Sequence, residues 1–414
     1  MPVLAYRSFD RPATPGGALA KVWQKILAMA ALALMAGGCT IDDSGIVNSV
    51  WRPADGQILH KQVVFVTDRV PDAAAAGGFG TRWADQATCG VAEAVIPPAR
   101  LPGEPVQWGY IAHNPPLRAC AAGGKMFGAV MAMLEAQATE RHCNSVFLFV
   151  HGFHTGFDGA VLRAAQVSHD AQTDCAVLTF DWTAENQVRR YDVDLEHSEY
   201  SLPLLAELLR ELSESNLRVS VLAHSMGNRL MLAALSGFAR SRYPVKPGFI
   251  DEMVLAAADV GVEKGDNDFQ HLMADAAPYV KRTTIYASSL DSVLAISEEA
   301  HGGVPRLGAE PVANYAYQAD DKTHIIDAID ASEPPADVFD HSYFAMSYEA
   351  VADMSLALDG VPLSDRLKGL DGWKPTLVCT NKDDCADTAL ATTRHPRLIT
   401  RIFVTLAPLI PLVQ

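Results

Sequence analysis

Short, continuously apolar runs alternate with segments that carry apolar residues at helical spacing between about residues 145 and 355. Runs such as 145–152 and 175–182 lack polar alternation, which indicates strands buried on both faces of a sheet. The predicted strands are 61–69, 88–98, 106–112, 145–152, 175–182, 219–225, 251–260, 282–291 and 324–330. The predicted helices are 128–140, 158–171, 200–215, 228–240, 268–280 and 343–354.

This order of elements predicts an α/β fold with a mostly parallel central sheet and helices on both faces. Segments 61–69 and 88–98 flank a glycine-rich loop, and we expect them to form antiparallel edge strands. We assign residues 61–370 to this domain. Residues 371–414 are expected to form a C-terminal extension packed on the core, because two prolines and its length argue against a membrane span.

The first 38 residues have the layout of a secretory signal. Lys21 and Lys25 precede an apolar run that is too short to span a bilayer, and small residues follow it directly before Cys39. This layout resembles a bacterial lipoprotein signal, in which Cys39 would be lipidated. The absence of an aspartate directly after Cys39 favours the outer membrane. The alternative is an ordinary signal peptide in which Cys39 has no role. Residues 39–60 are predicted to be a tether.

Composition narrows the class of partner. The 414 residues carry a formal net charge of −16, which argues against nucleic acid because phosphate binding requires a basic surface. No cysteine or histidine spacing typical of a zinc site occurs, so we expect no metal. The expected partners are a small-molecule or lipid-like substrate and, through the N-terminal anchor, a membrane.

The cysteines are consistent with an oxidising compartment. Apart from Cys39 there are six, an even number, as a disulfide framework requires. Counting alone leaves the pairing open. Their positions along the chain suggest the pairs Cys89–Cys120, Cys143–Cys175 and Cys379–Cys385.

One serine stands between a buried strand and a helix, in the segment VLAHSMGNR. A loose small-x-Ser-x-Gly pattern is weak evidence by itself, but a strand before it and a helix after it are typical of a nucleophile elbow. Ala223 and Gly227 are small, as expected where strand and helix backbones nearly touch. The pattern predicts Ser225 as a nucleophile.

A serine nucleophile needs a base, and the base needs an acid that fixes its tautomer. In this architecture the acid and then the histidine follow later strands. Asp291 and His341 occupy these places, with Asp259 as the alternative acid and His301 as the alternative base. His324 opens a strand and would face the wrong end of the sheet. His224 is expected to be a packed core histidine.

The oxyanion requires backbone N–H donors. We expect one from Met226, which follows the nucleophile, and one from Phe153 or else His154, in the loop after strand 145–152. The charged segment 183–201 is expected to lie over or beside this site.

Four residues in that segment or directly before it either shape a substrate pocket or lie on a solvated loop. They are Trp182, Tyr191, Asp192 and Glu196. Arg229 is expected to pair with an acid of the segment.

Taken together, the runs SVFLFVHGFHTGFDGAVL, LTFDW, VLAHSMGNR, TIYASSLDSVLAISEEAHGGVPRLG and HSYF resemble an α/β-hydrolase family of uncharacterised bacterial proteins. The resemblance spans about residues 60 to 355. It implies the α/β-hydrolase fold and a triad of Ser225, Asp291 and His341, but it implies little about substrate.

The expected function is an exported serine hydrolase that cleaves an ester-type bond through an acyl-enzyme on Ser225, without a cofactor. An acyltransferase that uses the same triad and a non-catalytic envelope binding protein remain the alternatives.

Overall fold

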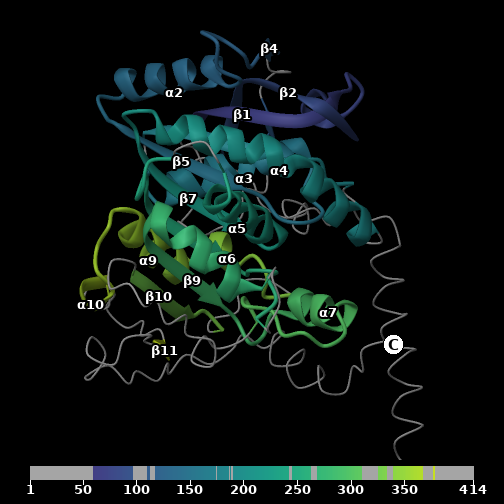
Figure 1. Ribbon diagram of the computed structural model, residues 1–414, viewed down its shortest axis with the longest axis vertical. Helices are drawn as coiled ribbons and strands as arrows, with labels where there is room; N and C mark the ends of the chain where they lie inside the picture. The colour runs from purple at the N-terminus through teal and green to yellow at the C-terminus, as the bar shows by residue number, and fades with distance from the viewer. Residues whose placement is uncertain are drawn as a thin grey trace, which may run out of the picture. The chain divides into compact units, whose positions relative to one another are not determined.

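A single mixed sheet organises the computed structural model (Figure 1). The structure describes residues 59–96, 110–111, 117–366 and 376–377, apart from 174, 186, 188–189, 242–244, 263–267, 310–324 and 333–338. Within these residues eleven strands join in the order β11-β10-β9-β8-β7-β5-β6-β1-β2-β3, and β4 also pairs with β2. The run from β10 to β1 is parallel throughout, while β2, β3, β4 and β11 are antiparallel to their neighbours. The predicted fold class is therefore confirmed.

The strands coincide with the apolar runs of the sequence, but β1 and β2 are longer than predicted. Their bounds are β1 (Leu59–Pro71), β2 (Phe79–Ile96), β3 (Tyr110–Ile111), β4 (Arg118–Ala119), β5 (Ser145–Val150), β6 (Ala176–Asp181), β7 (Arg218–His224), β8 (Ile250–Ala256), β9 (Val280–Ala287), β10 (Ile325–Asp330) and β11 (Thr376–Leu377). Pairing of β1 with β2 continues past two register shifts to Pro71 and Phe79. The predicted loop at 70–80 is therefore shorter, since both strands extend into it.

Helices connect the parallel strands. Their bounds are α2 (Gly128–Glu140), α3 (Phe157–Asp170), α4 (Tyr191–Ser213), α5 (Met226–Ala239), α6 (Phe269–Ala276), α7 (Ser292–Ala300), α8 (Tyr343–Met346), α9 (Tyr348–Leu358) and α10 (Leu363–Arg366), with short 3-10 helices η1 (Ala76–Gly78) and η3 (Ala277–Tyr279). No helix in the described ranges combines the length and apolar character that crossing a bilayer requires.

Two hydrophobic cores lie on opposite faces of the sheet. In β5, Val146, Leu148 and Val150 belong to one core, while Phe147 and Phe149 belong to the other. This alternation follows from the two-residue period of a strand. The first core includes buried side chains of α2, α4, α5 and α6, and the second includes those of α3, α8 and α9. Both faces of the strands are thus buried, which explains why their sequences are continuously apolar.

Helix α4 begins earlier than the sequence pattern predicts. It starts at Tyr191 rather than near Tyr200, so the second half of the charged segment is helical. Asp194, Ser198 and Ser201 form part of its buried side, which hides the apolar periodicity there. As expected, Arg229 of α5 pairs with an acid of this segment, Glu199, at 3.6 Å.

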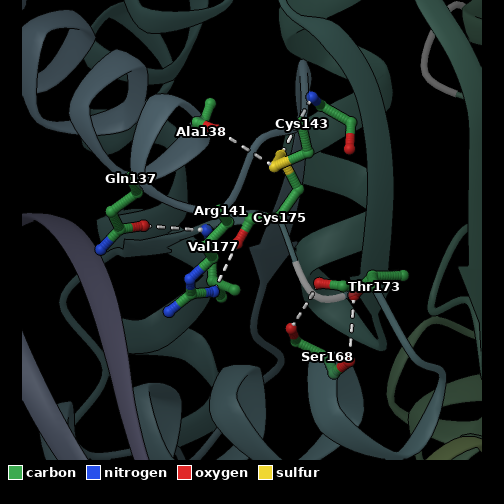
Figure 2. Close-up of a disulfide and its surroundings, with 9 residues drawn as sticks. Gln137, Ala138, Arg141, Cys143, Ser168, Thr173, Cys175 and Val177 are labelled. Atoms are coloured by element: carbon green, nitrogen blue, oxygen red, sulfur yellow. Dashed lines mark hydrogen bonds between the residues drawn. A yellow bond between two sulfur atoms is a disulfide. The ribbon is translucent and has the colours of Figure 1, made fainter.

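A disulfide joins Cys143 and Cys175, as predicted. Figure 2 shows that it links the end of the α2 segment to the start of the β6 segment, where Arg141 Nη1 also donates to the Cys175 carbonyl at 2.6 Å. The link therefore ties a helix to the strand that it packs against.

The predicted Cys89–Cys120 disulfide is wrong, because both cysteines are free and buried in the structure. Each thiol instead lies near a carbonyl on the other side of the β2–β4 pair: Cys89 Sγ is 3.6 Å from the Arg118 oxygen, and Cys120 Sγ is 3.4 Å from the Ala87 oxygen. Cys379, Cys385 and Cys39 lie outside the described residues, as do the predicted signal and most of the tether and C-terminal extension.

Candidate active site

The strand order places two loops side by side. Chain order runs β5, β6, β7, but β5 lies between β6 and β7 in the sheet. Loops that follow β5 and β7 therefore leave the sheet in adjacent positions and then diverge. Such a switch point at the carboxyl ends of parallel strands forms the usual ligand crevice of an α/β sheet.

Ser225 occupies a strained turn at this point. Strand β7 ends at His224 and α5 begins at Met226, so the serine alone makes the connection. Its φ of 50° and ψ of −122° lie in a region that L-residues rarely adopt. Two backbone hydrogen bonds hold it there: the Ser225 N–H donates to the Ala256 oxygen at 3.0 Å, and the Ser225 oxygen accepts from the Asp259 N–H at 3.2 Å. Ser225 therefore lies on a sharp strand-to-helix turn.

The elbow touches the loop after β5. A Cβ atom added at Gly227 would lie 2.3 Å from the His151 oxygen and 2.7 Å from the Val150 oxygen. One added at Gly152 would lie 2.7 Å from the Ser225 Cβ. The structure leaves no room for a Cβ atom at 227, nor at Gly152, which the elbow pattern does not include. Ala223, the other predicted small residue, is fully buried.

Asp291 and His341 meet although fifty residues separate them in the chain. Nδ1 of His341 lies 2.8 Å from Oδ2 of Asp291, and both side chains are largely buried. The other oxygen, Oδ1, caps α7 by accepting from the N–H groups of Val293 and Leu294 at 3.0 and 2.9 Å. The carboxylate is therefore fixed from one side while it faces the imidazole on the other.

His224 brings this pair beside the elbow. Its ring centroid lies 4.7 Å from that of His341, and its Nε2 donates to the His341 main-chain oxygen at 3.2 Å. His224 is 1% exposed and also packs on Phe344. The predicted core histidine is thus confirmed, and its contacts hold the His341 loop against the residue that directly precedes Ser225.

The alternative acid and base have other partners. Asp259 accepts hydrogen bonds from Tyr191 at 2.7 Å and Ser297 at 2.6 Å, and it forms an ion pair with Arg306 at 3.5 Å. His301 Nδ1 lies 2.8 Å from the Ser297 main-chain oxygen. His324 lies outside the described residues. The geometry therefore favours Asp291 and His341, because they contact one another.

The loop after β5 contains the other predicted donors. The Met226 N–H belongs to the first turn of α5, where N–H groups have no intrahelical acceptor. Among the described residues, the Phe153 N–H donates to no other group. The His154 N–H, the alternative, already donates to Asp194 Oδ2 at 3.2 Å. This leaves Met226 and Phe153 as the predicted oxyanion donors.

Of the four candidates in or just before the charged segment, two pack against the loop after β5 and two are exposed. Trp182 is fully buried, stacks on His151 at 4.9 Å and donates from Nε1 to the His151 oxygen at 2.8 Å. Tyr191 is half-buried and packs on Phe153, with ring centroids 5.3 Å apart. Asp192 and Glu196 are exposed. Of the four candidates, Tyr191 is the one that contacts a predicted site residue directly.

A buried ion pair lies beneath the loop after β5. Arg69 Nε donates to Asp181 at 2.9 Å, and Arg69 Nη2 donates to the Thr155 oxygen at 2.7 Å. Burial alone would raise the pKa of Asp181, but the charge of Arg69 and the neighbouring His151 outweigh it and hold that pKa below its ordinary value. No local pattern in the chain points to this pairing, because its partners are more than a hundred residues apart.

Comparison with known proteins gives a family. A model for alpha/beta hydrolases of unknown function (DUF900) matches residues 128–357, more than half of the 414-residue chain. No curated protein matches the chain.

Similar solved structures include esterase B from Lactobacillus rhamnosis, which is 12% identical over 83% of this chain and 96% of that chain, with a TM-score of 0.36. An esterase from Pyrobaculum calidifontis is 10% identical over 85% of this chain and 94% of its own, with a TM-score of 0.31. A dienelactone hydrolase from Anabaena variabilis is 13% identical over 66% and 92%, with a TM-score of 0.32.

The family match and the sheet agree with the resemblance noted in the sequence. The matched range contains the elbow, Asp291 and His341. The chain therefore belongs to a family of α/β-hydrolases of unknown function.

Proposed function

We propose that this protein is a serine hydrolase that cleaves carboxylic esters through an acyl-enzyme on Ser225. The observation that carries the proposal is the 2.8 Å contact between Asp291 and His341, next to a serine held at positive φ between strand and helix. A nucleophile, a base and an orienting acid are the three parts that acyl transfer by serine requires.

The proposed steps follow from these positions. Ser225 Oγ attacks the ester carbonyl carbon while His341 Nε2 accepts the hydroxyl proton. Asp291, bound at Nδ1, fixes the tautomer that leaves Nε2 free to accept. The carbonyl oxygen becomes an oxyanion, which the Met226 and Phe153 N–H groups stabilise. His341 then gives its proton to the leaving alkoxide, so that alcohol departs and Ser225 is acylated.

Water completes the cycle by the same route. His341 takes a proton from water, the hydroxide attacks the acyl carbon, and the proton returns to Ser225 as the carboxylic acid leaves. Hydrolase activity accords with the family to which the chain belongs. Ester specificity rests on the site's chemistry, since serine triads act on activated acyl groups without a metal.

A fluorophosphonate probe tests the proposal directly. We expect the wild-type protein to become labelled on the peptide that contains Ser225 and to hydrolyse p-nitrophenyl esters. Ser225→Ala should lose both the label and the activity. Ser220→Ala serves as a matched control, since that serine lies on the same strand and precedes the elbow. An unlabelled wild type, or equal ester turnover in Ser225→Ala, would refute the serine hydrolase.

We further propose that the protein is exported and anchored by a lipid on Cys39. The supporting observations are the signal-like N-terminus and the Cys143–Cys175 disulfide, a bond typical of exported proteins. Cys39→Ser is expected to move the protein from the membrane fraction to the soluble fraction and to abolish labelling by a clickable fatty acid. A wild type that is already soluble and carries no acyl group would contradict the anchor.

A further inference from the structure

The loop after β5 is held by side chains from three directions. Trp182 Nε1 donates to the His151 oxygen at its start, and Arg69 Nη2 donates to the Thr155 oxygen at its end. Both bonds engage carbonyl groups. They fix the two ends of the loop. They do not bind the N–H groups between those ends, which include the N–H of Phe153.

Asp194 contacts the middle of this loop, where the Thr155 hydroxyl also donates to the Phe153 oxygen at 3.3 Å. It lies in the first turn of α4 and is 0% exposed. Its Oδ2 accepts from the His154 N–H at 3.2 Å, and its Oδ1 accepts from the Glu185 N–H at 2.7 Å. One carboxylate therefore joins the loop after β5 to the loop after β6, and each of its oxygens has a backbone donor.

The loop needs such a restraint because His154 has a φ of 59°. Non-glycine residues rarely adopt this conformation, and they persist in it only where the surroundings impose it. The peptide unit between Phe153 and His154 carries the N–H that Asp194 binds, one unit after the Phe153 N–H. Fixing the His154 N–H toward α4 therefore restricts the direction in which the preceding N–H can point.

We propose that Asp194 is a positioning residue for the oxyanion loop: its carboxylate holds His154 at positive φ and thereby keeps the Phe153 N–H directed at the acyl oxygen. This inference rests on the proposed serine hydrolase. Asp194 itself touches no reacting atom. Its loss should slow acylation more than it weakens binding, because an oxyanion donor acts chiefly in the transition state.

The charge state of Asp194 gives a second way to observe this role. Burial raises the pKa of Asp194 to about 6, and the backbone donors of Glu185 and His154 oppose that rise. The charged or titratable groups that act on it are Arg69 from β1 and His197 from α4, and both also lower its pKa. Protonation near pH 6 turns one carboxylate oxygen into a hydroxyl that no longer accepts well from a backbone N–H. The loop restraint should therefore weaken in acid.

The test compares Asp194→Ala and Asp194→Asn with the control Asp192→Ala, an exposed acid in the same turn. We expect Asp194→Ala to lower kcat on p-nitrophenyl butyrate by about 10- to 100-fold, with KM changed by less than about threefold. The rate of fluorophosphonate labelling should fall in parallel. Asp192→Ala should match the wild type in all three measurements.

Asp194→Asn keeps the size of the side chain and supplies the readout that a structural role alone would not change. In the wild type, protonation of Asp194 near pH 6 should steepen the acid limb of the kcat/KM profile. In Asp194→Asn this contribution is lost, so the acid limb should become shallower.

Three results would decide the matter. An unlabelled wild type would remove the proposed function and this inference together. A labelled wild type with unchanged kcat in Asp194→Ala would remove the inference alone. A kcat loss in both variants that equals their loss of folded protein by circular dichroism, with the slope of the acid limb unchanged in Asp194→Asn, would also overturn it.

Discussion

Asp291→Asn is expected to lower kcat for ester hydrolysis by about 10⁴-fold, the size of effect seen when the acid of a serine triad becomes an amide. The carboxylate oxygen that faces His341 Nδ1 at 2.8 Å accepts from a ring N–H. An amide NH₂ in its place presents a donor to Nδ1, so the ring would carry its proton on Nε2 instead. That tautomer cannot accept the serine proton.

The substitution should leave the fold intact. Asp291 caps α7 through its other oxygen, and asparagine caps helices about as well as aspartate does. The matched control is Asp259→Asn, which alters the alternative acid within its contacts to Tyr191 and Ser297. We expect kcat of Asp259→Asn to stay within about tenfold of wild type. Single-turnover kinetics at pH 8 would check both variants, and the reverse ranking would assign the acid to Asp259.

The fold could be predicted because its strands are buried on both faces. A continuous apolar run such as β5 or β7, followed by helical periodicity, strongly favours a strand and helix of an α/β sheet. Helix α2 was predicted with the bounds that the structure shows, 128–140. Ser225 is chosen from the elbow pattern, and Asp291 and His341 from their order and placement after later strands, since loops after parallel strands all open at one edge of the sheet.

The supports of the site could not be predicted, because they are polar residues inside a segment that resembles a surface loop. Asp194 stands among other acids in the segment 191–199, and nothing in the sequence distinguishes it from the exposed Asp192. The difference arises only when α4 forms and turns one carboxylate toward the His154 N–H. Helix α7 is not among the predicted helices either. The predicted strand 282–291 runs through Asp291, which in the structure caps the start of this helix.

The predicted Cys89–Cys120 disulfide shows a second limit of reasoning from sequence. Position along the chain favours neighbours, and the two residues do lie close: Cys89 is on β2, and Cys120 directly follows β4, which pairs with β2. Each thiol lies near a carbonyl of the opposite segment and the two thiols also interact, but both cysteines are free in the structure. Proximity in sequence therefore predicted the correct region of the sheet but not the covalent link.

Arg69→Met is expected to lower the free energy of unfolding by about 3–5 kcal/mol, because it leaves a buried carboxylate without its cation. Arg69 is 1% exposed, and Asp181 is fully buried. The guanidinium also donates to main-chain oxygens of Thr155, Trp182 and Ala184, which would lose a buried partner. Methionine fills similar volume, so the loss should reflect charge and hydrogen bonding more than a cavity.

The loss of unfolding free energy in Arg69→Met should depend on pH in a defined direction. In the wild type the pKa of Asp181 lies below its ordinary value of 3.8, so the pair contributes stability above that pH and loses it as the pH falls through the folded pKa. Without Arg69, burial dominates and raises the pKa of Asp181 above the unfolded value. The ionised carboxylate then destabilises the variant most at neutral pH, and protonation relieves it. The difference between variant and wild type should therefore shrink between pH 7 and pH 4.5.

Urea unfolding at both pH values measures this difference, with Arg218→Met as the control. Arg218 is the first residue of β7, is 56% exposed, and pairs with Asp251 at 2.7 Å. Exposed pairs of this kind contribute about 0–1 kcal/mol. If Arg69→Met cost no more than Arg218→Met, or if its loss of stability grew in acid, the buried pair would not be what stabilises the loop after β5. A large loss of stability that shrinks in acid would instead identify the buried pair of Arg69 and Asp181 as a main support of the fold around the loop after β5.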